Sequence, residues 1–315
     1  MENPRRSGTF YEKYWKTAVK HDILPAERRV LMNFEKLALN SPVRSCFAKN
    51  SARTCDYVWG TLQMWRDYFD MSYTQMGESV LVRLDNYRGS RAYLCPRGAR
   101  AEEILRQLSL EDPHPRFCFV PEEALSTLRS VFPACEITEE PDWFDYLYDA
   151  KTFYAMSGKR YHGPKNHVNK FARFYPNAQF TDSPSTEELS VFLRQMEAAS
   201  TRDDPMARAE YSILEDMLLH REAYGMIWGA LRVNGILVAV SAAEILDDTM
   251  YVHVEKANTE YLGAYQAIAR AMAGIAVEKE IPYINREEDL GDPGLRRSKQ
   301  GYNPIALLKK YTVQI

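Results

Sequence analysis

The chain has 315 residues, of which 45% are hydrophobic and 26% are charged, so it is long enough for two domains with sizeable cores. Its formal net charge of −3 excludes a general attraction to nucleic acids or anionic membranes, although it leaves room for a local basic patch. The polar start Met1–Arg6 and the lack of an apolar run of about 18 residues predict a soluble, cytoplasmic protein without membrane insertion. Five scattered cysteines without a CxxC pair predict reduced structural thiols and no metal site.

Strands and helices follow one another through the first half. Ser79–Leu84 and Arg91–Leu94 alternate apolar and polar residues on either side of a turn, which predicts a hairpin. Apolar residues at helical spacing in Ala101–Leu108 predict an amphipathic helix. Phe117–Val120 is then expected to be a strand, and Pro121 to open another helix.

The middle of the chain is expected to separate two halves. An aromatic-rich stretch, Trp143–Tyr148, precedes a basic stretch, Lys159–Arg173. Ser185 followed by Glu188 forms a capping box and predicts a helix start. A further helix is expected near Ala207–Arg221.

The second half carries the clearest structural signal. Gly225–Arg232 and Ile236–Leu246 flank Asn234-Gly235, a pair that suits a type I′ turn, so they predict an antiparallel hairpin. Thr249–Val254 is expected to add a third strand.

A helix is predicted after Gly263, and the strand Pro282–Asn285 follows it. The start of that helix is a natural anion site, because its free N–H groups and its dipole favour phosphate. The first half shows a similar order of meander, helix and strand, which suggests a tandem duplication.

Two runs of residues carry a family resemblance. The first consists of Tyr146, Leu147, Tyr148, Phe153, Gly158, Lys159 and 165–171. The second consists of 284–291, 294–299 and 302–304. Together they resemble the phosphatidylglycerol lysyltransferase C-terminal-like family, which has a tandem GNAT fold.

The resemblance implies an α/β (α+β) fold. Two GNAT-like acyl-CoA N-acyltransferase domains are expected in tandem, with mixed, mostly antiparallel sheets flanked by helices. The expected boundaries are an N-terminal domain at 1–157, a basic linker or strand at 158–182, and a C-terminal domain with the donor site at 183–315.

A donor site for coenzyme A or acyl-CoA is also implied by the resemblance. The pyrophosphate loop Q/R-x-x-G-x-G/A of GNAT proteins corresponds here to Glu260–Tyr265, which keeps only the first glycine. The expected cofactor-binding residues are Leu262, Gly263, Ala264 and Tyr265. The alternative is a helix-entry glycine without a ligand.

Catalytic candidates lie at the end of the third strand of the meander. His253 or Glu255 is expected to take a proton from the acceptor amine, directly or through water. Tyr302 is expected to donate a proton to the leaving thiolate. The alternative is that His253 is a hydrogen-bonded strand residue and that Glu255 pairs with Lys256.

Polar residues in the two runs are expected to bind substrate. The linker contributes Lys165, Asn166, His167 and Asn169, and the loop after the last predicted strand contributes Asn285, Arg286, Glu287, Glu288, Asp289, Arg296, Arg297 and Lys299. The cations suit a phosphate or carboxylate, and the acids suit a substrate ammonium. The alternatives are an interdomain strut and a solvated cluster of charges.

Three functions are possible. The first, which we expect, is transfer of an acyl group from acyl-CoA to an amine of a small molecule or peptide. The second is aminoacyl-tRNA-dependent transfer, in which the basic stretch Lys159–Arg173 meets the tRNA. The third is a non-catalytic GNAT-like scaffold that binds a ligand or a protein. The oligomeric state is not predicted.

Overall fold

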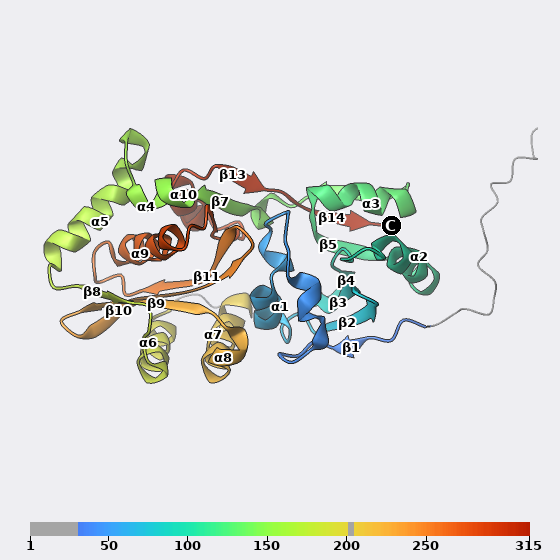
Figure 1. The fold of residues 1–315 in the computed structure, drawn as a ribbon, viewed down its shortest axis with the longest axis horizontal. Coiled ribbons are helices and arrows are strands. Elements are labelled where there is room, and N and C mark those ends of the chain that lie inside the picture. The colour runs from blue at the N-terminus through green and yellow to red at the C-terminus, as the bar shows by residue number, and fades with distance from the viewer. Residues whose placement is uncertain (1–30, 201–204) are drawn as a thin grey trace, which may run out of the picture. The chain divides into compact units, whose positions relative to one another are not determined.

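A computed structural model describes residues 31–200 and 205–315, and Asn33–Ile315 form one compact unit. Two mixed sheets organise this unit (Figure 1). The first sheet has the strand order β1 (Glu35–Lys36), β2 (Met71–Met76), β3 (Ser79–Tyr87), β4 (Ser90–Tyr93), β5 (Arg116–Pro121), β14 (Lys310–Gln314), β6 (Glu136–Glu139). The second has the order β13 (Ala306–Leu308), β7 (Asp145–Asp149), β12 (Tyr283–Asn285), β11 (Thr249–Ala257), β10 (Ile236–Leu246), β9 (Ile227–Val233), β8 (Gln179–Thr181).

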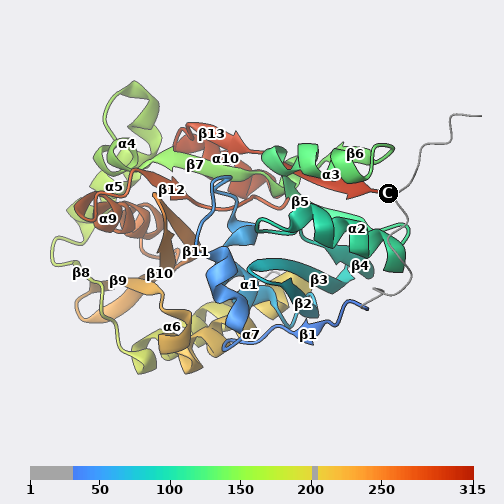
Figure 2. The same cartoon turned by 45° about the vertical axis from the view of Figure 1, so that its right-hand side comes forward.

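Helices flank both sheets (Figure 2). The helices of the described residues are α1 (Trp59–Trp65), α2 (Ala101–Glu111), α3 (Leu125–Val131), α4 (Ala150–Ala155), α5 (His162–Phe174), α6 (Thr186–Ala199), α7 (Pro205–Leu219), α8 (Arg221–Tyr224), α9 (Ala264–Glu278) and α10 (Pro293–Gly301). A β-bulge at His253 of β11 separates the two layers on the second sheet, because the extra residue places Val252 and Val254 on opposite faces. Val252 packs with α4 and α9, whereas Val254 packs with α6 and α7.

The meander expected in the second half is confirmed. β9, β10 and β11 pair antiparallel, and Asn234 and Gly235 both have positive φ, as a type I′ turn requires. α9 then leads into β12, which runs parallel to β11. The two strands pair only up to Tyr251 and Asn285, while β11 continues to Ala257. A divergence between β11 and β12 therefore opens beside the start of α9.

The first half repeats this order, as expected. β2, β3 and β4 form an antiparallel meander, α2 follows, and β5 lies parallel to β4 with Tyr93 opposite Phe117. Each half is thus a GNAT-like unit.

Strands are exchanged between the two halves across the expected boundaries. β7, expected in the first domain, pairs with β12 in the second sheet. β14, at the end of the chain, lies between β5 and β6 in the first sheet. The basic linker forms α5, which packs on α9, and then β8. Residues 1–30 of the expected first domain lie outside the described residues.

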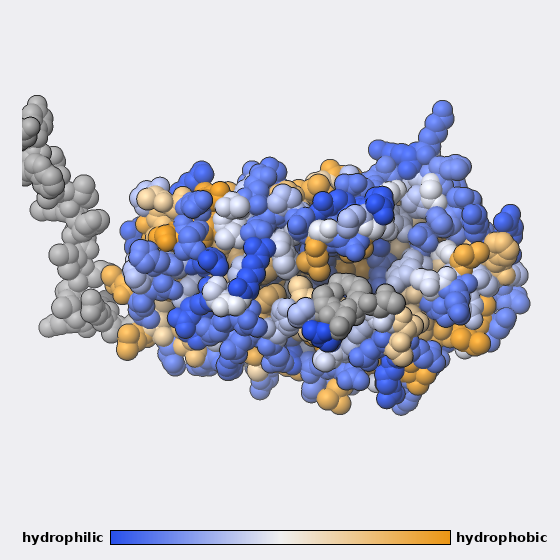
Figure 3. Space-filling model, turned by 180° about the vertical axis from the view of Figure 1, so that it is seen from behind, coloured by the Kyte–Doolittle hydropathy of each residue, from blue (hydrophilic) through white to orange (hydrophobic). Residues whose placement is uncertain are grey.

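Within the described parts of the chain, no helix combines the length and the apolar character needed to cross a membrane. Figure 3 shows one face, on which hydrophilic residues predominate and hydrophobic ones form small separate patches.

Candidate functional site

The donor loop predicted from the sequence begins α9. Gly263 is the N-cap of this helix, with a φ of 85°. A Cβ atom at Gly263 would lie 2.2 Å from the carbonyl oxygen of His167 and 3.2 Å from the Cβ atom of Phe171. The glycine therefore permits close contact with the main chain of α5. Its neighbours Leu262 and Tyr265 are 54% and 39% exposed, and Ala264 is buried.

His253 is buried between two carboxylates. Its Nε2 atom lies 2.9 Å from Glu244 Oε1, and its Nδ1 atom lies 2.7 Å from Glu287 Oε1. Burial on its own lowers the pKa of this imidazole, but the hydrogen bonds to Glu244 and Glu287 raise it to about 10. His253 is therefore an imidazolium at neutral pH, which has no free nitrogen to accept a proton and instead orients Glu287.

The other two catalytic candidates contact Arg286. Its guanidinium pairs with Glu255, with Nε 2.9 Å from Oε2, and lies 4.7 Å above the ring of Tyr302. Tyr302 is buried and stacks on Phe153. Burial raises the pKa of Tyr302 to about 12. The Arg286–Glu255 pair therefore connects the residue after β12 to β11 beyond the last paired residues, Tyr251 and Asn285.

Most charges of the loop after β12 bind one another. Arg296 forms a two-pronged pair with Asp289, at 2.7 and 2.8 Å, and Tyr146 donates to the same carboxylate. The Nζ atom of Lys299 donates to the carbonyl oxygens of Arg286 and Glu288. Four of the predicted substrate-binding residues, counting Arg286, thus hold the loop in shape.

Asn285 completes this scaffold. It is fully buried, its Nδ2 atom donates to Asp145, and its Oδ1 atom accepts from the backbone N–H of Glu287 at 2.6 Å. Glu287 has a φ of 57°, in the left-handed region that non-glycine residues adopt rarely. The loop is therefore bent so that Glu287 and Glu288 leave it toward the first half.

The remaining predicted residues are exposed. Arg297 lies on the outer side of α10. The linker residues Lys165, Asn166, His167 and Asn169 are exposed along α5. None of these five lines the cavity described next.

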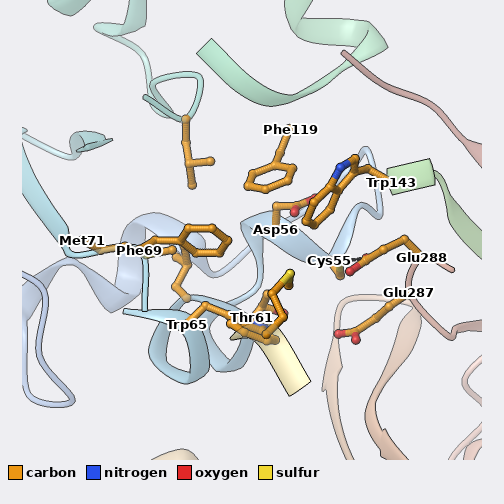
Figure 4. A pocket seen from close by; sticks show the side chains of 13 residues that line it. Cys55, Asp56, Thr61, Trp65, Phe69, Met71, Phe119, Trp143, Glu287 and Glu288 are labelled. Carbon is orange, nitrogen blue, oxygen red and sulfur yellow. Dashed lines mark hydrogen bonds between the residues drawn. The ribbon is translucent and has the colours of Figure 1, made fainter. Parts of the chain in front are cut away.

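A small cavity lies where the two halves meet (Figure 4). Its volume is about 30 Å³, enough for about two water molecules. Its walls are acidic on one side and aromatic or apolar on the other. The lining residues are Cys55, Asp56, Thr61, Leu62, Trp65, Phe69, Met71, Leu94, Phe119, Trp143, Met206, Glu287 and Glu288.

A cluster of buried charges adjoins the cavity. Lys310, from β14, is fully buried, and its Nζ atom lies 2.6 Å from Asp56 and 2.7 Å from Asp145. The same ammonium lies 3.5 Å from the carboxylate of Glu288 and 3.3 Å from the sulfur atom of Cys55. We call these five residues the junction cluster.

Three ionised acids beside one ammonium in a buried space would carry a large free-energy cost, because like charges repel strongly where water is absent. Burial, opposed by Lys310, raises the pKa of Asp56 to about 7. Burial also raises the pKa of Glu288 and, well above its usual value, that of the Cys55 thiol. Burial therefore disfavours the charged forms of Asp56 and Glu288, and Cys55 stays a thiol.

Three residues of the junction cluster also have the spacing of metal ligands. Ligand atoms of Cys55, Asp56 and Asp145 lie within 4.8 Å of one another, a spacing that fits a metal ion. Lys310 contacts all three, so an ammonium already provides the positive charge there.

Sequence reasoning missed the junction cluster except for Glu288. Lys310 follows Lys309 near the end of the chain and gives no local sign of burial, and Asp145 lies in a stretch assigned to the boundary. The available signal was the buried strand Asp145–Asp149, in which a charged first residue calls for a partner.

The architecture defines the class of protein. Two units of meander, helix and parallel strand, with a cavity at their junction, form a tandem GNAT-like fold. The chain belongs to the family described as phosphatidylglycerol lysyltransferase, C-terminal, whose profile matches residues 47–314. This family of transferases is the one that the two motif runs resemble, so that prediction is confirmed.

Solved structures agree with this assignment. A conserved protein of unknown function from Bacteroides thetaiotaomicron is 27% identical, with a TM-score of 0.81 over 90% of this chain and 100% of that one. The C-terminal domain of a putative lysylphosphatidylglycerol synthetase from Agrobacterium fabrum has the same fold at 12% identity, with a TM-score of 0.63 over 86% of this chain and 90% of that one.

A curated relative is an uncharacterised protein of Mycoplasmoides gallisepticum, 22% identical over 182 residues. The match covers 54% of this chain and 56% of that relative, so it spans just over half the length of each protein.

Proposed function

We propose that this protein transfers an aminoacyl group from an aminoacyl-tRNA to a nucleophilic acceptor. The observation that carries the proposal is the cavity at which Asp56, Glu287 and Glu288 meet. An ammonium group is about the size of one water molecule and pairs well with carboxylates in a closed site. Every aminoacyl ester carries such a group next to its reactive carbonyl. The family description makes lysyl the first aminoacyl group to test.

The surface of α5 supports an RNA donor. The chain carries no aspartate or glutamate from residue 151 to residue 181. Exposed cations of this stretch include Lys159, Arg160, Lys165 and Arg173. A basic surface on a chain whose net charge is −3 matches a phosphate backbone, which binds cations with an affinity that falls as salt rises.

Acyl-CoA is the second donor that we consider, because Gly263 opens α9 with a left-handed φ, as a phosphate-binding turn does. Two features weigh against it. The carbonyl oxygen of His167 faces Gly263 and would repel a pyrophosphate oxygen. The ion pair between Arg286 and Glu255 joins the residue after β12 to β11 beyond the point where the two strands stop pairing.

The test uses tRNA charged with radiolabelled lysine, arginine or alanine. The protein is mixed with each tRNA and with acceptors of separate classes: anionic phospholipid vesicles, free amines and a short peptide. Transfer of label to any acceptor supports the proposal. Transfer from acetyl-CoA but from none of the aminoacyl-tRNAs would overturn it in favour of the second donor.

Variants of the cavity acids sharpen this test. Glu287→Gln and Glu288→Gln each remove a charged partner of the ammonium, so we expect roughly 10- to 100-fold slower transfer. Glu260→Gln is the matched control, since Glu260 is exposed and lies outside the cavity. On α5, Lys165→Gln should weaken tRNA binding and lower the slope of log affinity against log salt by about 0.7–0.9.

A further inference from the structure

Asp56 is the acid that the first half contributes to the cavity. It comes from the 3-10 helix Cys55–Tyr57 of the first half and lines the cavity, whereas Glu287 and Glu288 enter from the second half (Figure 4). Its Oδ2 atom lies 2.6 Å from the Nζ atom of Lys310. Asp56 is thus paired with a buried ammonium at the edge of the cavity.

The neighbouring carboxylates are engaged elsewhere. Both oxygens of Asp145 accept hydrogen bonds: Oδ2 accepts from the backbone N–H of Cys55 at 2.7 Å and from Asn285 at 3.0 Å, and Oδ1 pairs with Lys310. Glu287 is held by the imidazolium of His253. Asp145 and Glu287 are therefore fixed in place by these donors. Of the two remaining acids, Asp56 lies nearer to Lys310, at 2.6 Å against 3.5 Å for Glu288.

We infer that Asp56 is the proton acceptor of the reaction and that Lys310 is the positioning residue that keeps its carboxylate charged beside the cavity. This inference rests on the proposed function.

The proton transfer balances within one cycle. The acceptor nucleophile attacks the ester carbonyl carbon, and its proton passes to the Asp56 carboxylate as the new bond forms. The bond between the carbonyl carbon and the ribose oxygen then breaks, and the same proton moves from Asp56 to that oxygen. The tRNA leaves with a free hydroxyl group, and the carboxylate is restored.

The ionisation of Asp56 suits this role. Burial raises the pKa of Asp56 to about 7, and the charge of Lys310 opposes a larger rise. The titratable groups that face Asp56 are Lys310 of β14, Asp145 of β7, Glu287 and Glu288 of the loop after β12, Cys55 and Tyr57 beside it, and Cys118 of β5. Lys310 is the cation of this group, so removing its charge disfavours the Asp56 carboxylate.

The test measures transfer as a function of pH in wild type, Asp56→Asn, Lys310→Arg and Lys310→Met. Asp56→Asn keeps the shape of the side chain, and we expect kcat to fall by roughly 10²- to 10⁴-fold with KM little changed. The rise of kcat/KM with pH, centred near 7 in wild type, should persist in Lys310→Arg and move to higher pH in Lys310→Met. Asp67→Asn is the matched control, because the Asp67 side chain is 87% exposed.

A second readout separates the two hypotheses. Carbon-13 NMR of the Asp carboxyl carbons follows the protonation of Asp56 without any substrate, and Asp56→Asn identifies its signal. A group that titrates near pH 7 in a protein that transfers nothing contradicts the proposed function, and with it the role in catalysis. Transfer by wild type with an unchanged rate and pH profile in Asp56→Asn overturns the inference alone. If Lys310→Met does not fold, Lys310→Arg and Asp56→Asn still decide the matter.

Discussion

At the scale of single residues, His253 shows how a catalytic candidate becomes a structural charge. Its side chain is fully buried, and both ring nitrogens face carboxylates. Glu244, one of the two, also accepts from the backbone N–H of Gly60 at 2.8 Å, so the chain of contacts runs from α1 in the first half to Glu287 at the cavity. His253 therefore aligns an acid of the cavity rather than accepting a proton itself.

His253→Gln should lower the free energy of unfolding in a pH-dependent way. The pKa of His253 is raised to about 10 in the folded protein from 6.5 in an unfolded chain. Its contribution to stability is thus complete below pH 6.5 and is lost as the pH rises toward 10. We expect a loss of about 3–5 kcal/mol at pH 6, as for a broken buried pair, and a smaller loss at pH 9.

Urea unfolding at both pH values measures this difference. His220→Gln is the control, since His220 is 42% exposed and its pair with Asp216 is worth at most about 1 kcal/mol. An equal loss at both pH values for His253→Gln would show that the imidazole is neutral in the fold.

At the scale of elements, Gly263 has a role in the packing of α9 against α5. The N-terminus of α9 meets the main chain of α5 there, so the glycine is needed for helix packing, whether or not a ligand binds nearby.

Gly263→Ala should separate packing from backbone strain. The new Cβ atom would collide with the carbonyl oxygen of His167, and an alanine would also be strained at a φ of 85°. Gly235→Ala introduces only the backbone strain, because Gly235 has a φ of 81° and nothing lies within 4 Å of the added Cβ atom. We expect a loss of about 1 kcal/mol for Gly235→Ala and about 2–4 kcal/mol for Gly263→Ala in thermal unfolding. Equal losses for the two variants would mean that α5 moves away from the new Cβ atom without lowering the free energy of unfolding.

Local elements could be predicted from the sequence where the signal lies within a few residues. The Asn234-Gly235 hairpin and the capping box of Ser185 and Glu188 depend on turn and cap chemistry, and both form as expected. Strand exchange could not be predicted in this way. Nothing local in Lys310–Gln314 tells which of two sheets it joins, because the pairing partners lie about 190 residues away in the sequence.

The roles of the site residues could not be predicted for the same reason, because they depend on contacts between residues that are far apart in the sequence. The loop after β12 was expected to be functional because its residue pattern resembles a family, but the pattern does not distinguish acids that hold the loop, such as Asp289, from acids that face the cavity, such as Glu288. The three-dimensional contacts make that distinction.

At the scale of the whole molecule, the two halves act as one unit because they share strands and charges. β14 carries Lys310 from the first sheet into a cluster that includes Asp145 of the second. Arg53 pairs with Asp248 across the same junction, and Asn50 contacts Asp247. The cavity therefore exists only when both halves are folded and the final strand is paired.

The most direct test of this account is a crystal structure with a 3′-aminoacylamido-3′-deoxyadenosine, a stable amide analogue of the end of an aminoacyl-tRNA. We predict that its ammonium lies in the junction cavity, within about 3 Å of a carboxylate oxygen of Glu287 or Glu288. Binding of the analogue at Leu262–Tyr265, with the cavity still closed and holding only water, would contradict the account.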